Sequence, residues 1–232
     1  MSDLIPAPTR QDLLSILVTE HFTLQGARSA TISDANGRTS FFLGTLSGAV
    51  VALAFAAQIA GVGMQFTVFG LILLPTMLFI GLVTFERLVQ LQLENLNCVR
   101  AINRIRHYYM EVAPELAPHI TLSPFDDLRG MMTSLGSYRE RLEWWQMFVT
   151  NAGMIAVVDG ILAGVIAALA ASSLGVDVAG SIAAAVVVGA LLIAGLMLYQ
   201  GRARRLSAAA SPARFPAGGP IDAIHAARED AV

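Results

Sequence analysis

The sequence predicts an all-α integral membrane protein with four transmembrane helices, a cytoplasmic helical hairpin and an N-terminal cytoplasmic helix. Composition is the first observation: of 232 residues, 55% are hydrophobic and only 14% are charged, whereas about 25% are charged in a soluble domain. The second is a set of four apolar runs without Lys or Arg, since a helix needs roughly 20 such residues to cross a bilayer. These runs are residues 41–61, 66–85, 147–171 and 178–199.

The distribution of arginine predicts the orientation of these spans. Every basic residue is Arg, and residues 1–40, 86–146 and 200–232 contain all of them, while the short loops 62–65 and 172–177 contain none. Cytoplasmic flanks retain Arg and short translocated loops do not. We therefore expect a multi-pass protein of the bacterial inner membrane with both termini in the cytoplasm and no ectodomain to bind an external partner.

The spans divide the chain into five predicted parts. They are a cytoplasmic amphipathic helix at 1–40, a transmembrane hairpin at 41–85, a cytoplasmic helical hairpin at 86–146, a second transmembrane hairpin at 147–199 and a disordered cytoplasmic tail at 200–232. The tail is assigned as disordered because it is rich in Ala, Pro and Gly and has little apolar periodicity.

Local patterns predict where the cytoplasmic helices begin. Thr9 to Asp12 form a capping-box pattern, which starts a helix by satisfying free N–H groups. Residues 86–112 lack Gly and Pro and keep apolar residues at helical spacing, so we expect the second span to continue as a stalk of about 40 Å. Ser123 and Pro124, followed by two acids, predict the start of a returning helix. We expect it to run through Tyr138 and Trp144 into the third span.

Apolar residues give the N-terminal helix one hydrophobic side. We expect this side to pack on the other cytoplasmic helices, because a helix lying on the membrane surface is normally richer in cationic residues. The residues are Leu13, Ile16, Leu17, Phe22 and Leu24.

Asp159 is the one ionisable residue near the middle of the third span. A mid-membrane carboxylate is costly and by default marks an ion path or a proton relay. The alternative is a protonated Asp that donates one hydrogen bond to a neighbouring helix. Pro75 leaves the carbonyl of Leu71 without its helical donor, and Thr76 offers a hydroxyl, so we expect one of these to be the partner.

Small residues recur every fourth position in the first and third spans, including Gly44 and Gly48 in one and Gly160 and Gly164 in the other. Such faces allow two helix backbones to approach closely in lipid. They indicate either packing within one subunit or an interface between subunits. The second possibility predicts self-association.

Arg100, Arg104 and His107 share one face of the predicted stalk. Such a cluster suits an anionic small molecule or a partner protein. The alternative is pairing with acids on the returning helix, because charge on a helical hairpin is usually solvated or paired. The candidate acids are Asp126, Glu140 and Glu143.

Several function classes are not expected. The net charge of -2 argues against nucleic-acid binding, which needs a basic surface. One cysteine, Cys98, and no cluster of Cys and His argue against a structural metal site. The sequence has no phosphate-binding loop and no hydrolase motif, so we expect neither a cofactor nor enzymatic activity.

Two functional hypotheses remain. The first is a small homo-oligomeric channel-like or membrane-permeabilising protein, in which the spans around Asp159 line a path and the cytoplasmic helices act as a gate or sensor. The alternative is a non-conducting membrane anchor or scaffold whose cytoplasmic helices bind a partner protein. The exposure of Asp159 to water separates them, because a conducting path needs this residue to be accessible.

Overall fold

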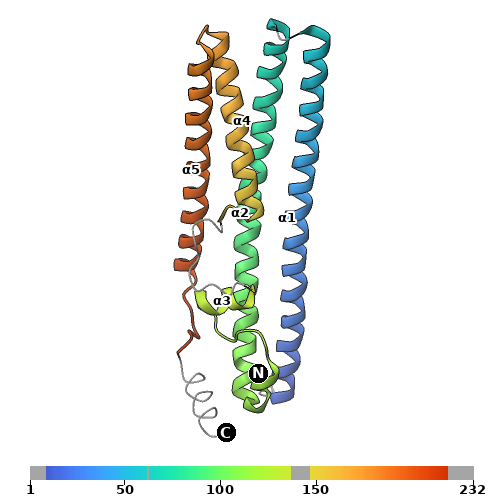
Figure 1. Ribbon diagram of the computed structural model, residues 1–232. Helices are drawn as coiled ribbons and strands as arrows, with labels where there is room; N and C mark the ends of the chain where they lie inside the picture. Colours follow the sequence, from blue (N-terminus) through green and yellow to red (C-terminus); the bar gives the residue numbers. More distant parts are fainter. Residues whose placement is uncertain (1–8, 62, 137–146, 219–232) are drawn as a thin grey trace, which may run out of the picture. The chain divides into compact units, whose positions relative to one another are not determined.

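The computed structural model describes residues 9–61, 63–136 and 147–218, and within these residues the regular structure is entirely helical (Figure 1). Four helices are long and apolar enough to cross a membrane, which confirms the number of predicted apolar helices. In chain order the helices are α1 (Arg10–Ala60), α2 (Met64–Val112), the 3-10 helix η1 (Pro114–His119), α3 (Leu128–Ser134), α4 (Asn151–Ser173) and α5 (Val178–Ala210).

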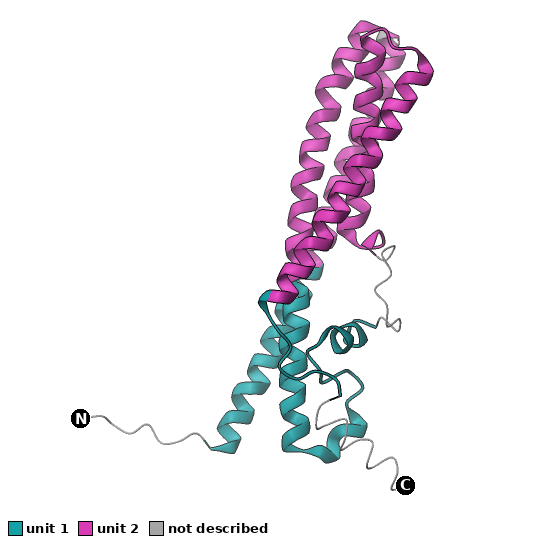
Figure 2. Cartoon of the chain, turned by 90° about the vertical axis from the view of Figure 1, so that its left-hand side faces the viewer, with its two compact units in different colours: residues 1–32, 94–141, 210–232 teal, residues 33–93, 142–209 magenta. Residues whose placement is uncertain are grey.

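The chain divides into two compact units (Figure 2). Unit 1 consists of residues 1–32, 94–141 and 210–232, and unit 2 of residues 33–93 and 142–209. Both α1 and α2 contribute one part to each unit. Each unit therefore combines segments that are far apart in the sequence.

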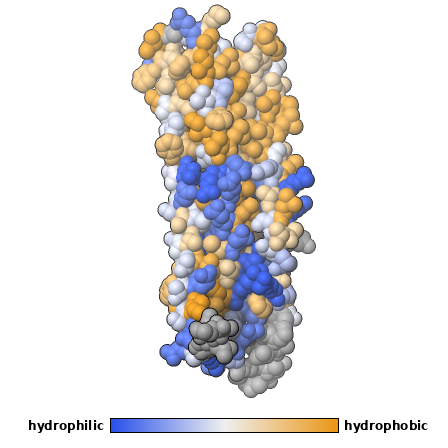
Figure 3. Space-filling view, turned by 180° about the vertical axis from the view of Figure 1, so that it is seen from behind, coloured by the Kyte–Doolittle hydropathy of each residue, from blue (hydrophilic) through white to orange (hydrophobic). Residues whose placement is uncertain are grey.

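Unit 2 contains a hydrophobic core assembled from all four long helices. Phe42, Phe85 and Ile155 are among its most deeply buried side chains. Many other large apolar side chains of these helices are exposed, such as Phe41 and Phe79, and Figure 3 shows hydrophobic residues gathered toward the top of its view. Helices that cross a bilayer present such apolar surface to lipid.

Unit 1 contains buried polar contacts beside its buried apolar side chains, such as Val99 and Ile102. Asn103 of α2 is fully buried, and its side-chain amide nitrogen donates to the Phe125 carbonyl at 2.7 Å. Its amide oxygen accepts from the Ser134 hydroxyl of α3 at 3.0 Å and from the Arg106 guanidinium at 2.9 Å. One amide side chain thus joins the stalk, the loop before α3 and α3 itself, as expected when a buried polar group must be satisfied.

The helix boundaries follow the predicted signals at three positions. The Thr9 hydroxyl accepts from the Asp12 N–H at 3.2 Å, and the Asp12 carboxylate accepts from the Thr9 N–H at 2.9 Å, which is a reciprocal capping arrangement. Helix α1 then continues without a break to Ala60. Helix α2 continues past its apolar span to Val112, and Pro114 follows at the start of η1.

The returning helix differs from its predicted start. The Ser123 hydroxyl accepts from the N–H of Phe125, so Ser123 forms a local turn rather than a helix cap. Asp127 caps α3 instead, accepting from the Gly130 N–H at 2.8 Å. Helix α3 begins at Leu128 and has 7 residues. Tyr138 and Trp144 lie outside the described residues.

The region after the fourth span also differs from its prediction. Helix α5 continues to Ala210, although residues from 200 onward were expected to be disordered. Residues 211–218 then form an ordered segment in unit 1. The three alanines at 208–210 favour a continued helix. The segment that follows is held by residues distant in sequence, which a local pattern does not indicate.

Candidate functional sites

The first candidate site surrounds Asp159 on α4. Its side chain is fully buried, with 0% exposure, and neither carboxylate oxygen has a hydrogen-bond partner among the described residues. It points at Gly81 of α2, where an added Cβ would overlap Oδ1 and lie 2.7 Å from Cγ. The missing side chain of Gly81 therefore provides the space that the carboxyl group occupies.

Thr76 and Pro75 do not contribute to this site. Both are exposed on α2, and the Thr76 hydroxyl donates to the Ile72 carbonyl at 2.8 Å. A threonine hydroxyl in a helix commonly donates to the backbone carbonyl four residues earlier. The expected hydrogen bond between Asp159 and Thr76 or the Leu71 carbonyl is absent from the structure.

The two pairs of glycines have different surroundings. A Cβ on Gly164 would lie 2.7 Å from the Ala185 carbonyl oxygen of α5, and one on Gly160 would lie 2.9 Å from the Gly189 carbonyl oxygen. This face of α4 therefore packs closely on α5 within the chain. Gly44 and Gly48 of α1 are exposed, and a Cβ on either would meet no atom within 4 Å.

A polar cluster in unit 2 was missed by the sequence reasoning. Gln200 of α5 is fully buried and donates through its side-chain nitrogen to Gln92 of α2 at 3.0 Å and to the Thr150 hydroxyl at 3.1 Å. Thr150 also caps α4 by accepting from the Gly153 N–H, and Arg204 donates to Gln92 at 3.3 Å. The sequence signal for this cluster was Gln200 itself, a polar residue directly after the apolar run of the fourth span.

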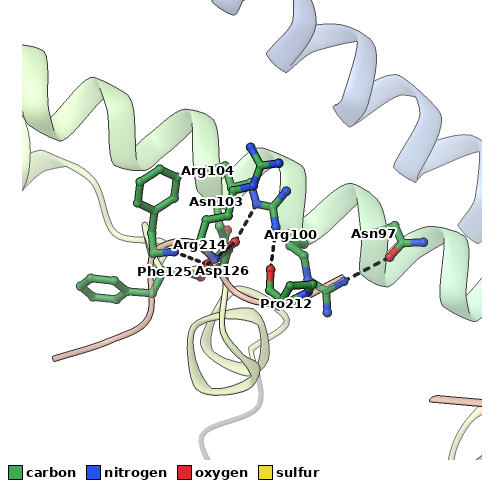
Figure 4. A network of polar contacts seen from close by, with 9 residues as sticks. Asn97, Arg100, Asn103, Arg104, Phe125, Asp126, Pro212 and Arg214 are labelled. Atoms are coloured by element: carbon green, nitrogen blue, oxygen red, sulfur yellow. Dashed lines mark hydrogen bonds and ion pairs between the residues drawn. The ribbon is translucent and has the colours of Figure 1, made fainter. Parts of the chain in front are cut away.

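The second candidate site is centred on Asp126 in unit 1 (Figure 4). Its fully buried carboxylate accepts from Arg104 Nε at a hydrogen-bonding distance of 2.6 Å. It also accepts from the backbone N–H of Arg214 at 2.9 Å and from that of Phe215 at 2.8 Å. The backbone N–H of Asp126 donates to the Phe215 carbonyl at 3.1 Å. Asp126 is therefore the main attachment point for the segment after α5.

Neighbouring residues extend this attachment. Arg104 Nη2 donates to the Pro212 carbonyl at 3.1 Å, and the Asp127 carboxylate accepts from the Ala217 N–H at 3.1 Å. The His107 and Phe215 rings are stacked, with centroids 4.0 Å apart and planes inclined by 24°. Residues 212–217 are thus held by main-chain hydrogen bonds and one aromatic contact.

Electrostatics favour the ionised form of Asp126. Burial by itself raises the pKa of this carboxyl, but hydrogen bonds from the Arg214 N–H, the Arg104 side chain and the Phe215 N–H outweigh burial and lower the pKa below its usual value. Burial lowers the pKa of the Arg100 guanidinium, and the adjacent Arg104 lowers it further. The site therefore pairs the Asp126 carboxylate with Arg104, and the Arg100 guanidinium lies close by.

Arg100, Arg104 and His107 have separate roles in the structure. Arg104 pairs with Asp126, as the pairing interpretation predicted. Arg100 is buried and contacts the Asn97 side chain at 3.5 Å, and its Nε has no partner among the described residues. His107 stacks on Phe215. The other candidate acids, Glu140 and Glu143, lie outside the described residues.

The apolar side of α1 in unit 1 is only partly covered. Leu17 and Leu24 are partly buried, but Leu13, Ile16 and Phe22 are exposed, with 68% of Phe22 accessible. The expectation that all five apolar residues pack on neighbouring helices is therefore wrong for these three. The residues that face α2 instead include His21, whose ring lies 6.0 Å from that of Tyr109.

Comparison with known proteins gives no relative for this chain. No protein-family model matches it, and no curated protein or solved structure shows significant similarity to it.

Proposed function

We propose that the protein is a non-conducting membrane anchor whose unit 1 lies in the cytoplasm and binds a partner protein there. The observation that carries this proposal is the burial of Asp159. A carboxylate that lines a conducting path must contact water or ions, whereas this one is 0% exposed and packs against Gly81. A buried mid-membrane acid without a second charge is better suited to a helix contact than to a relay, because relays usually contain several ionisable groups.

The surface of unit 1 supports partner binding. Ile16 and Phe22 of α1 are 62% and 68% exposed, and neither belongs to the apolar runs that cross the bilayer in the proposed topology. Leu128 at the start of α3 is 61% exposed. Large apolar side chains exposed outside the membrane are typical of protein contact surfaces when they are grouped.

The proposal predicts that purified protein in liposomes passes no ions. Flux from native protein and from an Asp159→Asn variant should equal that of protein-free liposomes, because the carboxyl group has no contact with water. The same samples are crosslinked to record their assembly size, and their helix content is compared by circular dichroism. Ion flux from the native chain that the Asp159→Asn variant loses would overturn the proposal.

A homo-oligomeric channel is the second candidate, and one observation favours it. The exposed face of α1 that carries Gly44 and Gly48 has no neighbour within 4 Å of either added Cβ, which leaves it available to a helix of another subunit. In the liposome experiment, flux accompanied by a defined crosslinked assembly supports the channel. A crosslinked assembly without flux instead favours an oligomeric anchor.

A further inference from the structure

We propose that Arg104, His107, Asp126 and Asp127 form a peptide-binding site that accepts a bent Pro-x-x-Phe-Pro segment of a partner protein in exchange for the chain's own residues 212–217. This inference rests on the proposed function, because it names the class of partner that unit 1 binds.

The site recognises mainly main-chain atoms. Asp126 accepts from two consecutive N–H groups, those of Arg214 and Phe215, and donates to the Phe215 carbonyl. Arg104 binds the Pro212 carbonyl and Asp127 binds the Ala217 N–H. A peptide supplies these backbone groups when it bends as residues 214 and 215 do, because consecutive N–H groups of a fully extended chain point to opposite sides. Main-chain hydrogen bonds of this kind give peptide-recognition sites affinity without a large apolar contact.

One side chain adds selectivity. The Phe215 ring stacks on His107 at a centroid distance of 4.0 Å, and such an aromatic anchor is typical of peptide contacts. The side chains of Ala213 and Arg214 are exposed, so the site places little demand on them. Pro216 has no N–H to satisfy, and its ring restricts the backbone of Phe215.

The bound segment is suited to exchange. Residues 211–218 form neither a helix nor a strand, and Phe215 is only half-buried. Their attachment depends on hydrogen bonds to a buried, charged carboxylate, which stay strong for any chain that supplies the donors. The chain's own segment has the advantage of a short connection to α5, and this raises its effective concentration to the millimolar range. A free peptide therefore binds well only when the internal segment is weakened.

The test uses the full chain carrying Phe215→Ala and a fluorescent, end-blocked peptide with the sequence of residues 209–218. We expect saturable binding in detergent, measured by fluorescence anisotropy, that is at least about tenfold tighter than binding to the native chain, whose site is occupied. A peptide N-methylated at the Phe215 nitrogen loses the hydrogen bond from this position to Asp126 and keeps the one from Arg214. It should bind at least about tenfold more weakly, as expected for a hydrogen bond to a charged group.

Variants of the peptide serve as controls, because they leave the folding of the protein unchanged. An Ala213→Ser peptide should bind like the native peptide, since this side chain is exposed. A Phe215→Ala peptide should bind weakly because it loses the contact with His107. Equal binding of the native and N-methylated peptides, or no binding to the Phe215→Ala chain, would overturn the proposal. Ion flux in liposomes would remove the proposed anchor function without changing this result.

Discussion

At the residue scale, three fully buried polar side chains show three ways to accommodate a polar group. Asp126 is ionised and surrounded by donors, so its desolvation is offset by charge-assisted hydrogen bonds. Gln200 has two partners for its amide nitrogen. Asp159 has none among the described residues, and its position depends on the shape of its surroundings, above all on the missing side chain of Gly81.

This dependence predicts that Gly81→Ala and Asp159→Ala are coupled. Alanine at position 81 overlaps the Asp159 carboxyl, so it should destabilise the protein by about 1–3 kcal/mol, as expected for overpacking. In the Asp159→Ala background the same change should cost little, because the added methyl group then occupies vacated space. Thermal unfolding of the four proteins in detergent gives the interaction energy.

Gly48→Ala is the matched control for this cycle. A Cβ at Gly48 has no neighbour within 4 Å, so the substitution should stabilise the helix by about 0.5–1 kcal/mol. If the effects of Gly81→Ala and Asp159→Ala were simply additive, the two side chains would not share the same space and the described contact would be incorrect.

At the scale of elements, equal sequence patterns lead to unequal packing. Helices α1 and α4 both contain glycines four residues apart. Gly160 and Gly164 pack against α5, whereas a Cβ on Gly44 or Gly48 would meet no described atom within 4 Å. In contrast, the segment after α5 lacks regular structure but is firmly attached through Asp126. Local pattern therefore does not decide which element finds a partner.

The attachment of residues 212–217 predicts a pH dependence of stability. The pKa of Asp126 lies below its ordinary value of 3.8 in the folded protein. As the pH falls, the Asp126 carboxylate is therefore protonated at a higher pH in the unfolded chain than in the folded protein. The stabilisation is therefore complete above about pH 5 and is lost as the pH decreases through the lowered folded pKa. The difference in unfolding temperature between the native protein and Asp126→Asn should be constant near neutral pH and should shrink below about pH 4.

Asp34→Asn is a suitable comparison for this measurement. Asp34 pairs with Arg38 at 3.0 Å, but the two side chains are 39% and 48% exposed, so the substitution should have a small effect. A difference between the native protein and Asp126→Asn that stayed unchanged down to pH 3 would exclude the ionised carboxylate as its source.

At the scale of the whole molecule, the two units differ in how they are stabilised. Unit 2 has an apolar core and an apolar surface, as suits helices long enough to cross a bilayer. Unit 1 combines buried apolar side chains with hydrogen-bonded polar residues such as Asn103 and Asp126, and part of its α1 surface is polar. This contrast supports the proposal that unit 2 lies in the membrane and unit 1 in water.

The proposed topology predicts which residues face the outside of the cell. Arginine is absent from the loop at 172–177 and present on both sides of residue 209, so the loop should be external and position 209 cytoplasmic. In a Cys98→Ser background, a membrane-impermeant maleimide applied to intact cells should label Ser172→Cys. Ala209→Cys should be labelled only after lysis, and labelling of both variants in intact cells would contradict the topology.

The four long helices and their apolar character could be predicted from the sequence. The start of α1 at the pair Thr9 and Asp12 and the end of α2 at Val112 were predictable, because caps, prolines and apolar runs act through neighbouring residues. The returning helix was less predictable, since both Ser123 and Asp127 are good cap residues and the helix begins after Asp127.

Which side chains meet could not be predicted without the tertiary structure. The contact between Asp126 and Arg214 joins residues 88 positions apart, and nothing local to either residue indicates it. The same holds for the contact between Asp159 and Gly81. Thr76, which the sequence suggested as a partner of Asp159, instead donates to a carbonyl of its own helix. Helix formation depends on nearby hydrogen bonds and composition, but the pairing of helix faces depends on close packing between distant residues. The residues of both candidate sites are brought together by such long-range packing.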